Sequence, residues 1–459
     1  MPIDSARRRS RLPGRLPLGS IGLLALALLL TSPAGAGVVE TGRAQCCSSI
    51  VPELPPATYY GATMRRDDDP RSRWHPYLHP PAAPPAPIDV LLRRIDDLEG
   101  NGGPMNPDLS LALEGLGAAY LAENRYREAV QALRPGIHLA RVNEGLHTPS
   151  QVRMLEQLIL AHLRQGDYAS ADEQQAYLFR VRRWRHSVDE DVVLEATKRY
   201  ADWLRGAYLA DVDDERYPRL VGLSDLYEDA IESLEELQGA DSTALLPYLQ
   251  GRVELSYLIS VYPGEQDGGF QADARQPLDF AATSDAQIRF WRLRDHNFRY
   301  GLQALQRKES ILATGEDQRP DARADAILAI GDWYQWHRRY AEAIRTYKEA
   351  WRYTEGIPGG RDWQVKHLGR PLELPKETVF NPGLVPLDTP NSATISVRFD
   401  VNRHGEAKDI AFLTPESEEN RIAITRAYHY LRNVRFRPRV SEGSVVRTEG
   451  LERTYDIRF

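Results

Sequence analysis

One group of side chains in this sequence has the residue types of a metal site. Asp67, Asp68 and Asp69 precede His75 and His79, and carboxylate and imidazole groups at short spacing can coordinate a metal ion. Prolines surround them, however, and the stretch has no regular periodicity that would hold the ligands in one geometry. We therefore interpret these residues as solvated parts of a linker, and we expect no bound metal.

A second acidic group lies between residues 263 and 283, in a segment rich in glycine, proline and acidic side chains. Asp267 and Asp273 could suggest a calcium site, because calcium prefers carboxylate oxygens. The alternating ligand spacing of an EF-hand loop is absent. We interpret the segment as an exposed insertion.

The common sequence signatures of enzymes are missing. The chain contains no HExxH, GxSxG, Walker A or CxxC pattern, so we name no catalytic residue and expect no cofactor. An enzyme of the hydrolase or cell-wall class with an unrecognised site stays open as an alternative. A cluster of carboxylates is interpreted as a solubilising helix surface; it consists of Glu228, Asp229, Glu232, Glu235 and Glu236.

Three tryptophans, Trp333, Trp336 and Trp351, stand at helical spacing. Core packing is the ordinary role of such residues, and a peptide-stacking surface is the alternative, since exposed aromatic side chains make good binding anchors. The elements around them therefore decide which role applies.

Composition and charge describe an ordinary globular chain. It has 459 residues, a formal net charge of -7, 42% hydrophobic and 27% charged residues. No basic stripe with interleaved aromatic residues appears, so nucleic acid is not an expected partner. The two cysteines, Cys46 and Cys47, exclude a disulfide framework, and an interchain bridge, a vicinal disulfide or two free thiols remain open.

The first 36 residues have the pattern of a secretory signal peptide. A basic segment with five arginines precedes the apolar run Ile21 to Leu30, and Ala34-Gly35-Ala36 offers small residues for cleavage. The run is about half the ~20 residues that a membrane-spanning helix needs. We predict cleavage after Ala36 and no integral membrane span in the exported chain; an uncleaved anchor is the alternative.

Helical periodicity begins near Ile88, after a proline-rich linker predicted over 37–88.

The helical pattern is clearest near the end of this region. Ile327, Gly331 and Tyr334 lie on one face of a helix, and a short polar break separates them from a second helix that begins at Tyr340. Small residues allow two antiparallel helices to approach closely, and aromatic rings fill the space beside them.

The motif of an aromatic residue followed three positions later by a small residue occurs five times. The small residues are Ala129, Ala171, Ala230, Gly301 and Ala343. Consecutive small residues are 42 positions apart at the first and last steps, and 59 and 71 positions apart at the two middle steps. We assign the extra residues of the middle steps to loops around 211–216 and 263–283. Leu116-Gly117-x-x-Tyr120 precedes the first occurrence on a helix of its own.

This pattern resembles the tetratricopeptide repeat (TPR), a helix-turn-helix unit that stacks into a solenoid. The resemblance implies about five helix pairs over residues 89–356, with close crossings at Gly117 and Ala129 and at Gly331 and Ala343. Tyr120 and Tyr334 would belong to the repeat core. A TPR solenoid presents a groove to protein or peptide partners.

Periodicity changes after a second proline-rich segment, 357–391, which we predict to be a linker. Ile395, Val397, Phe399 and Val401 alternate with polar residues, as in a half-buried strand, and Gly405 supplies a turn. A second strand, a helix over 418–432, and strands over 434–440 and 451–459 follow. The sequence thus predicts a mainly α chain that ends in a small α+β domain.

This order resembles the C-terminal domain of TonB-type energy transducers over residues 392–459. The matching core residues are Val397, Phe399, Gly405, Phe436, Pro438 and Phe459. The resemblance implies a periplasmic docking domain that engages envelope or outer-membrane proteins, partly by adding a strand to its sheet. We expect a periplasmic interaction scaffold; a divergent energy transducer tethered by an uncleaved signal is the alternative.

Overall fold

The computed structural model describes residues 64–65, 86–185, 190–210, 216–262, 285–314, 320–374, 385–386 and 392–458. Cys46–Phe459 form one compact unit, which is the part discussed below. Several sequence predictions fall outside the described residues: the signal peptide over 1–36, Cys46 and Cys47, Asp67 to Asp69, His75, His79, Asp267, Asp273 and Phe459.

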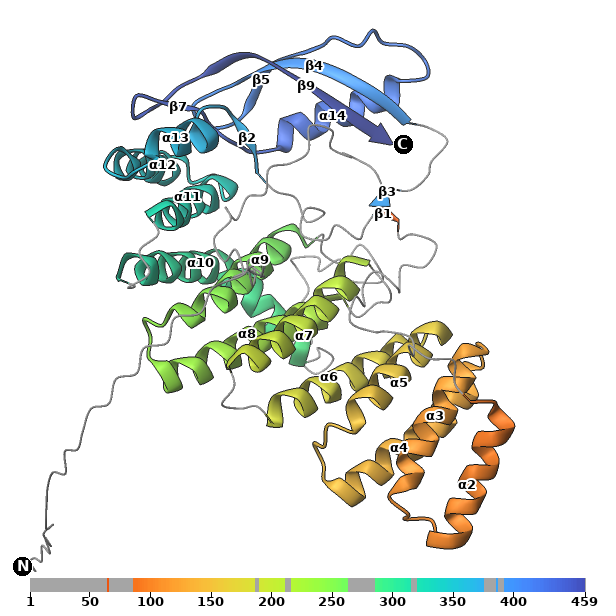
Figure 1. The fold of residues 1–459 in the computed structure, drawn as a ribbon. Coiled ribbons are helices and arrows are strands. Elements are labelled where there is room, and N and C mark those ends of the chain that lie inside the picture. The colour runs from red at the N-terminus through yellow and green to blue at the C-terminus, as the bar shows by residue number, and fades with distance from the viewer. Residues whose placement is uncertain are drawn as a thin grey trace, which may run out of the picture. The chain divides into compact units, whose positions relative to one another are not determined.

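The mainly α fold class is confirmed. Ten of the described helices form five consecutive helix pairs, and α2 precedes them (Figure 1). In the part of the chain that the structure describes, no helix is long and apolar enough to cross a membrane. The bounds are α2 Ile88–Gly102, α3 Asp108–Ala122, α4 Tyr126–Glu144, α5 Gln151–Gln165, α6 Tyr168–Arg185, α7 Glu190–Ala210, α8 Arg216–Gln238, α9 Leu246–Val261, α10 Asp285–Thr314, α11 Pro320–Trp336 and α12 Tyr340–Glu355.

Pairing within a repeat follows from small residues that face large ones. A Cβ atom added at Gly117 of α3 would lie 2.4 Å from the Leu133 side chain of α4, and one added at Gly331 of α11 would lie 2.6 Å from the Tyr347 ring of α12. Glycine at these positions lets each helix approach its partner closely, because any side chain there would overlap the opposite residue.

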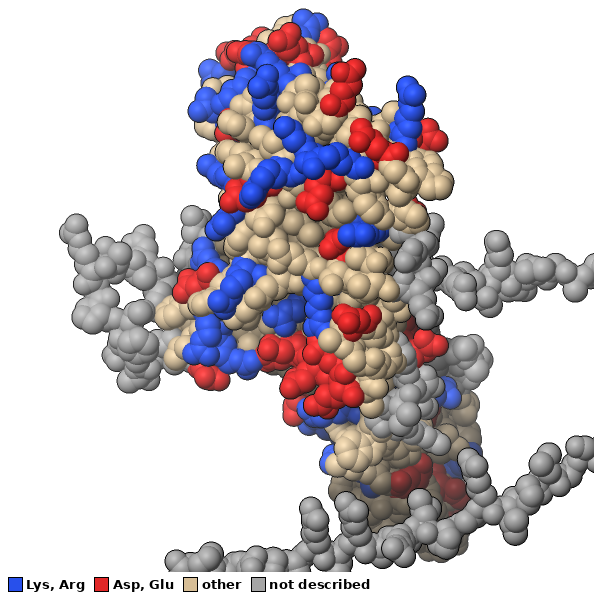
Figure 2. Space-filling view, turned by 90° about the vertical axis from the view of Figure 1, so that its left-hand side faces the viewer, with Lys and Arg blue, Asp and Glu red and all other residues tan. Residues whose placement is uncertain are grey.

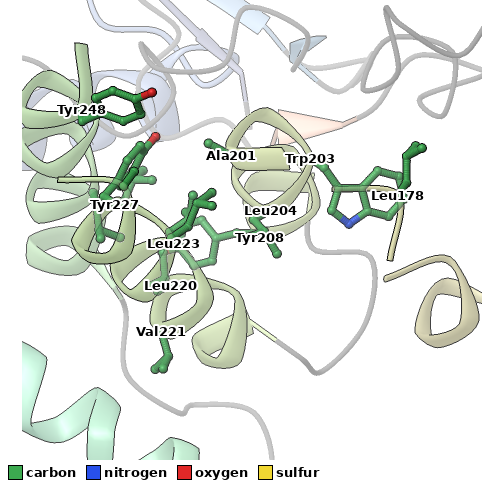
Figure 3. Packing of buried hydrophobic residues seen from close by; sticks show 14 of the residues in the cluster. Leu178, Ala201, Trp203, Leu204, Tyr208, Leu220, Val221, Leu223, Tyr227 and Tyr248 are labelled. Carbon is green, nitrogen blue, oxygen red and sulfur yellow. The ribbon is translucent and has the colours of Figure 1, made fainter. Parts of the chain in front are cut away.

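A continuous apolar core runs through the helix pairs, from Leu121 of α3 to Trp333 of α11. Figure 3 shows Leu204 and Tyr208 of α7 beside Leu220 and Leu223 of α8, all of them buried. Polar groups join this core as well. On α6, Asp172 accepts hydrogen bonds from Trp203 Nε1 of α7 at 2.6 Å and from Arg219 Nη2 of α8 at 2.7 Å. One carboxylate therefore ties the second helix pair to the third.

The five aromatic-to-small motifs all lie on the second helix of a pair, but not at the same depth. Tyr126, Tyr168 and Tyr340 are the first residues of α4, α6 and α12. Tyr227 and Phe298 lie well inside the longer helices α8, of 23 residues, and α10, of 30 residues. The assignment of the excess in the 59-residue step to a loop needs correction, because most of that excess lies in longer helices.

The predicted linker over 357–391 needs correction in its first part. A nine-residue helix, α13 (Gly360–Leu368), fits between Pro358 and Pro371, and it follows Gly359, whose φ is +74°. Its buried residues Trp363 and Leu368 belong to the same core cluster as the last helix pair. Prolines at both ends limited the helix without preventing it, since proline is disruptive only inside a helix.

The C-terminal region is a three-stranded antiparallel sheet, β5-β4-β9, with one helix packed on it (Figure 1). Ile395, Val397, Phe399 and Val401 of β4 are all fully buried in its core, as their alternation predicts. Shorter strands pair outside this sheet, β2 with β6, β7 with β8 and β1 with β3. The bounds are β1 Met64–Arg65, β2 Leu372–Glu373, β3 Val385–Pro386, β4 Ser392–Val401, β5 Ala407–Phe412, α14 Arg421–Asn433, β6 Phe436–Arg437, β7 Val440–Ser441, β8 Ser444–Val445 and β9 Thr448–Arg458.

The strand predicted over 434–440 is divided in two. Pro438 separates β6 from β7 and has no N–H to donate to a neighbouring strand. β6 pairs with β2 rather than with the main sheet. Its residues, 436–437, lie against α11 of the last helix pair. This placement creates the site described next.

Candidate functional site

The repeat residues singled out in the sequence are spread along the solenoid. Gly117, Gly331, Ala129, Ala171, Ala230, Gly301 and Ala343 are buried between helices, and Tyr120 and Tyr334 are half-buried. They serve helix packing, in the case of Gly301 between α10 and α11 of neighbouring pairs, and the structure does not bring them together into one site. They position the helices, and the surface that binds a partner must be sought elsewhere.

The C-terminal residues singled out in the sequence do converge, in part, on the last helix pair. Val397, Phe399 and Phe436 lie in the domain core, and Pro438 follows two residues after Phe436. The Phe436 amide donates a hydrogen bond to the Gly405 carbonyl oxygen at 2.9 Å. The turn at Gly405 and strand β6 therefore form one surface, which faces α11.

An ion pair in which both side chains are buried connects this surface to α11. Arg437 donates from Nε to Asp332 Oδ1 at 2.9 Å and from Nη2 to Asp332 Oδ2 at 2.6 Å. The side chains are 0% and 1% exposed. A bidentate guanidinium–carboxylate pair fixes both distance and orientation, so residues separated by 105 positions in the chain are held in one geometry.

Further hydrogen bonds satisfy both charged groups. Arg437 Nη1 donates to the His367 carbonyl oxygen at 2.9 Å, and Tyr347 donates its hydroxyl hydrogen to Asp332 Oδ1 at 3.0 Å. Burial lowers the pKa of Arg437, but the adjacent Asp332 carboxylate outweighs it and leaves that pKa raised. The guanidinium therefore remains charged, and a buried charge is tolerated only when it is paired in this way.

A second contact explains why residue 405 is glycine. Its φ is +68°, and a Cβ atom there would lie 1.9 Å from the Phe436 carbonyl oxygen and 2.2 Å from Gln335 Nε2. Gln335 of α11 donates from Nε2 to the carbonyl oxygens of His404, at 2.5 Å, and Phe436, at 3.0 Å. The glycine thus serves both the turn and the close approach of the two parts.

The tryptophans divide between the two roles considered for them. Trp333 is fully buried, and its Nε1 donates to the Phe298 carbonyl oxygen at 3.0 Å. Trp351 is half-buried and bonds Glu355 at 2.9 Å. Trp336, also half-buried, lines an open cavity beside the C-terminal domain. Trp351 lines a second open cavity, beside α13 and β7. Both Trp336 and Trp351 are therefore placed as a binding residue would be.

The carboxylates over 228–236 lie on a mixed surface. Glu228, Asp229, Glu232 and Glu236 are exposed, and Glu235 forms an ion pair with Arg307. Figure 2 shows basic and acidic side chains interspersed on the face that it presents. Among the described residues, no group of three or more His, Cys, Asp or Glu side chains could hold a metal ion.

Sequence reasoning missed Asp332 and Arg437, although Asp332 left a signal. It is a single charged residue in the apolar run from Ala326 to Trp333, where a buried carboxylate would need a partner. Nothing in the sequence identified that partner, because arginines flank Phe436 on both sides. Only the packed structure distinguishes Arg437, which bonds Asp332, from Arg435, which lines the cavity.

His337 makes stability at this site depend on pH. Its ring lies against Phe298 and Trp333, with centroids 5.0 and 4.3 Å away. Burial, and secondly the charge of Arg339, lowers the pKa of His337 to about 4 from 6.5. The unfolded chain therefore binds more protons between these values, so the free energy of unfolding falls as pH decreases through 6.5 towards 4.

We expect this residue to contribute about 1 to 2 kcal/mol of the stability lost between pH 7 and pH 5. Replacing it by His337→Phe, which keeps an aromatic ring and removes the titrating group, should flatten the dependence by that amount. Denaturant unfolding at both pH values measures it. His138→Phe, at an exposed position of α4, is the control and should keep the parent's slope; an equal slope in both variants would contradict the assignment.

Comparison with known proteins gives structural neighbours only. No protein-family model matches the chain, and no curated protein matches it. Two solved structures of kinesin light chain "nearly identical TPR-like repeats" from Podosopora anserina, one of them a single-residue variant of the other, are 14% and 13% identical. They cover 57% of this chain and 97% and 96% of their own, with TM-scores of 0.27 and 0.28.

BtubC (BKLC) from P. vanneervenii is 12% identical over 64% of this chain and 94% of its own, with a TM-score of 0.26. All three scores are below 0.5. The TPR-like fold is therefore inferred from the helix packing within this chain and not from these scores.

Proposed function

We propose that this protein is an interaction scaffold of the bacterial cell envelope, in which a TPR-like solenoid and a TonB-like docking domain act as one rigid body. The observation that carries the proposal is the Asp332–Arg437 pair, because it lies at the contact between the two parts and is buried from water. A partner bound by the solenoid and a partner bound by the C-terminal domain would then be held at a fixed separation.

The chemistry of the contact supports a permanent association. Separating the parts would expose the pair to water, and it would also break the hydrogen bonds from Gln335 to His404 and Phe436 and from Arg437 to the His367 carbonyl oxygen. Val440 and Val445 of the C-terminal region also lie in the apolar core cluster of the last helix pair, whereas contacts made and broken repeatedly are usually more polar and wetter. The site therefore has the character of a structural joint, and partner binding is assigned to the surfaces on either side of it.

The sheet offers a surface for the docking role. In the order β5-β4-β9, both outer strands have an edge that is unpaired within the described sheet, and β9 extends over 11 residues. A partner segment could add a strand there, with main-chain hydrogen bonds supplying affinity and side-chain pockets supplying specificity. The resemblance to TonB C-terminal domains favours this mode, and the signal-like segment over 1–36 favours the periplasm.

N-terminal sequencing of the protein recovered from its native cell envelope, with its partition between soluble and membrane fractions, tests the location. We expect a soluble chain that begins near Gly37. A membrane-bound chain that retains Leu23 to Leu30 would overturn the free scaffold and favour a tethered energy transducer. Recovery of the chain in the cytoplasm with residue 1 intact would overturn both.

A further inference from the structure

A basic cavity of about 660 Å³ opens beside the joint, between the α11–α12 turn and the C-terminal domain. Three arginines and a histidine line it, from two elements that are far apart in sequence: Arg338 from the turn, and Arg426, His429 and Arg435 from α14 and the segment after it. No Asp or Glu is among the described residues that line it. The remaining wall is largely apolar and consists of Trp336, Leu374, Tyr430, Asn433 and Val434.

Arg435 is built into the wall of this cavity. The residue is 8% exposed, and its Nη1 donates to the carbonyl oxygens of Asn433 at 2.7 Å and Val434 at 3.2 Å. No carboxylate within ion-pair distance of this guanidinium is found among the described residues. The remaining donors of the fork are thus available to a ligand, while the backbone bonds hold the group in place.

Arg338 brings a second positive charge to the same opening. Burial, and secondly the charge of Arg338, lowers the pKa of Arg435, while Tyr340 and Glu406 act in the opposite direction with a smaller effect. Two guanidinium groups that repel one another are an arrangement that an anion would relieve, because a carboxylate between them replaces repulsion by two charge-assisted hydrogen bonds.

The backbone at Arg338 has a conformation that arginine rarely adopts. Three turns between paired helices share one geometry: Asn124, Gly166 and Arg338 all have positive φ, and each amide donates to the carbonyl three residues before it, at 3.0 Å. Asparagine and glycine suit this left-handed conformation, whereas arginine does not. The unfavourable residue occurs at the turn that borders the basic cavity.

We propose that this cavity binds a carboxylate-bearing peptide segment of a protein partner, with an apolar side chain adjacent to the anionic group. The carboxylate would bond Arg435 and Arg338, and the apolar side chain would lie against Trp336 and Val434. The volume favours a short peptide over a single small anion, since it falls in the range of sites for drug-sized ligands. The inference rests on the proposed scaffold function and names the chemistry of one partner.

The test is titration of the full chain with the peptide acetyl-Glu-Leu-Phe as the free acid, followed by calorimetry and by Trp fluorescence. Controls are the neutral peptide acetyl-Gln-Leu-Phe amide and inorganic phosphate alone. We expect binding of the acid only. Equal binding of the neutral peptide, or binding of phosphate as strong as that of the acid peptide, would overturn the assignment, and so would no binding of any probe.

The decisive variant is Arg338→Asn, which places in this turn the residue that the first turn already has. It should lower the affinity for the acid peptide by about tenfold or more, as expected for the loss of a charge-assisted hydrogen bond. Its unfolding midpoint should equal or exceed the parent's, because asparagine tolerates the conformation better. Arg345→Asn, at an exposed position of α12, removes the same charge outside the cavity and should bind normally.

A second variant, Arg435→Gln, should weaken binding as well, with circular dichroism to check the fold. If Arg338→Asn binds the acid peptide as tightly as Arg345→Asn, the assignment fails. That failure would not contradict the scaffold function, which has separate tests. N-terminal sequencing tests the location, and the Asp332 variants test the rigid joint. Failure of those tests would leave the titration result unchanged.

Discussion

Asp332→Ala will detach the C-terminal domain from the last helix pair. The substitution leaves the Arg437 guanidinium buried without its carboxylate, and breaking a buried ion pair by removing one partner costs about 3 to 5 kcal/mol. The hydrogen bonds of Gln335 and the packing of α13 cannot compensate, because they do not neutralise the charge. We expect rapid proteolysis in the segment between α12 and β4 under conditions in which the parent protein resists cleavage.

Two controls separate loss of charge pairing from loss of packing. The double variant Asp332→Leu with Arg437→Met removes both charges and fills the space with apolar atoms, so it should recover most of the protection. Glu452→Ala breaks the exposed Arg398–Glu452 pair in the same domain, whose side chains are 54% and 56% exposed, and should cost less than about 1 kcal/mol.

The rigid-body proposal would fail if Asp332→Ala resisted proteolysis as well as Glu452→Ala does. If the double variant were as easily cleaved as the single one, the unpaired charge of Arg437 would not be the cause of the detachment. Distances between labels on α12 and α14 give an independent measurement, because a detached domain broadens their distribution.

Trp333→Ala will strongly destabilise the contact between the fourth and fifth helix pairs. Trp333 is fully buried where α10 and α11 cross, and its ring contacts Tyr257 and Phe298 with centroids 4.9 and 6.4 Å away. Truncating a buried tryptophan costs about 3 to 5 kcal/mol, because the cavity left behind closes only in part. Denaturant unfolding monitored by circular dichroism measures the loss.

Substitutions at Gly301, which faces the Trp333 ring, test whether the loss of stability comes from the packing of this ring. A Cβ atom added at Gly301 would lie 2.4 Å from Trp333 Cζ2, so Gly301→Ala should destabilise the parent by about 1 to 3 kcal/mol through overpacking. In the Trp333→Ala background, Gly301→Leu should instead restore stability by occupying the vacated space. A double-mutant cycle gives the coupling energy between the two positions.

Gly222→Ala is the matched control for this cycle. It lies inside α8, and a Cβ atom there would be 3.5 Å from the nearest Leu204 atom, an ordinary contact. The change should be neutral or stabilising by up to about 1 kcal/mol, as for glycine to alanine in a helix interior. If Gly301→Ala behaved like Gly222→Ala, the close approach to Trp333 would not be limiting.

Local periodicity made much of the fold predictable. The recurrence of a small residue after an aromatic one marked the second helix of every pair, because helices meet closely only where a small residue faces a large one. The alternation through Val397 and Phe399 likewise located β4, since successive side chains of a strand point to opposite faces. Both signals are carried by residues close together in the chain.

The placement of whole elements was less predictable. Helix α13 was missed because Pro358 and Pro371 suggested an unstructured linker, and its nine residues gave too short a pattern to outweigh them. The lengths of α8 and α10 were missed for a similar reason: their motifs lie deep inside the helices, and the extra turns before them carry no such motif.

The sequence by itself determined the type and order of the elements, because these depend on spacing over a few residues. The tertiary structure alone decided that Asp332 meets Arg437, that Gln335 reaches the turn at Gly405, and that Arg338 and Arg435 border one cavity. These pairs are separated by roughly 70 to 105 positions. Which of several nearby arginines is buried depends on how two packed surfaces meet, and no local pattern encodes that choice.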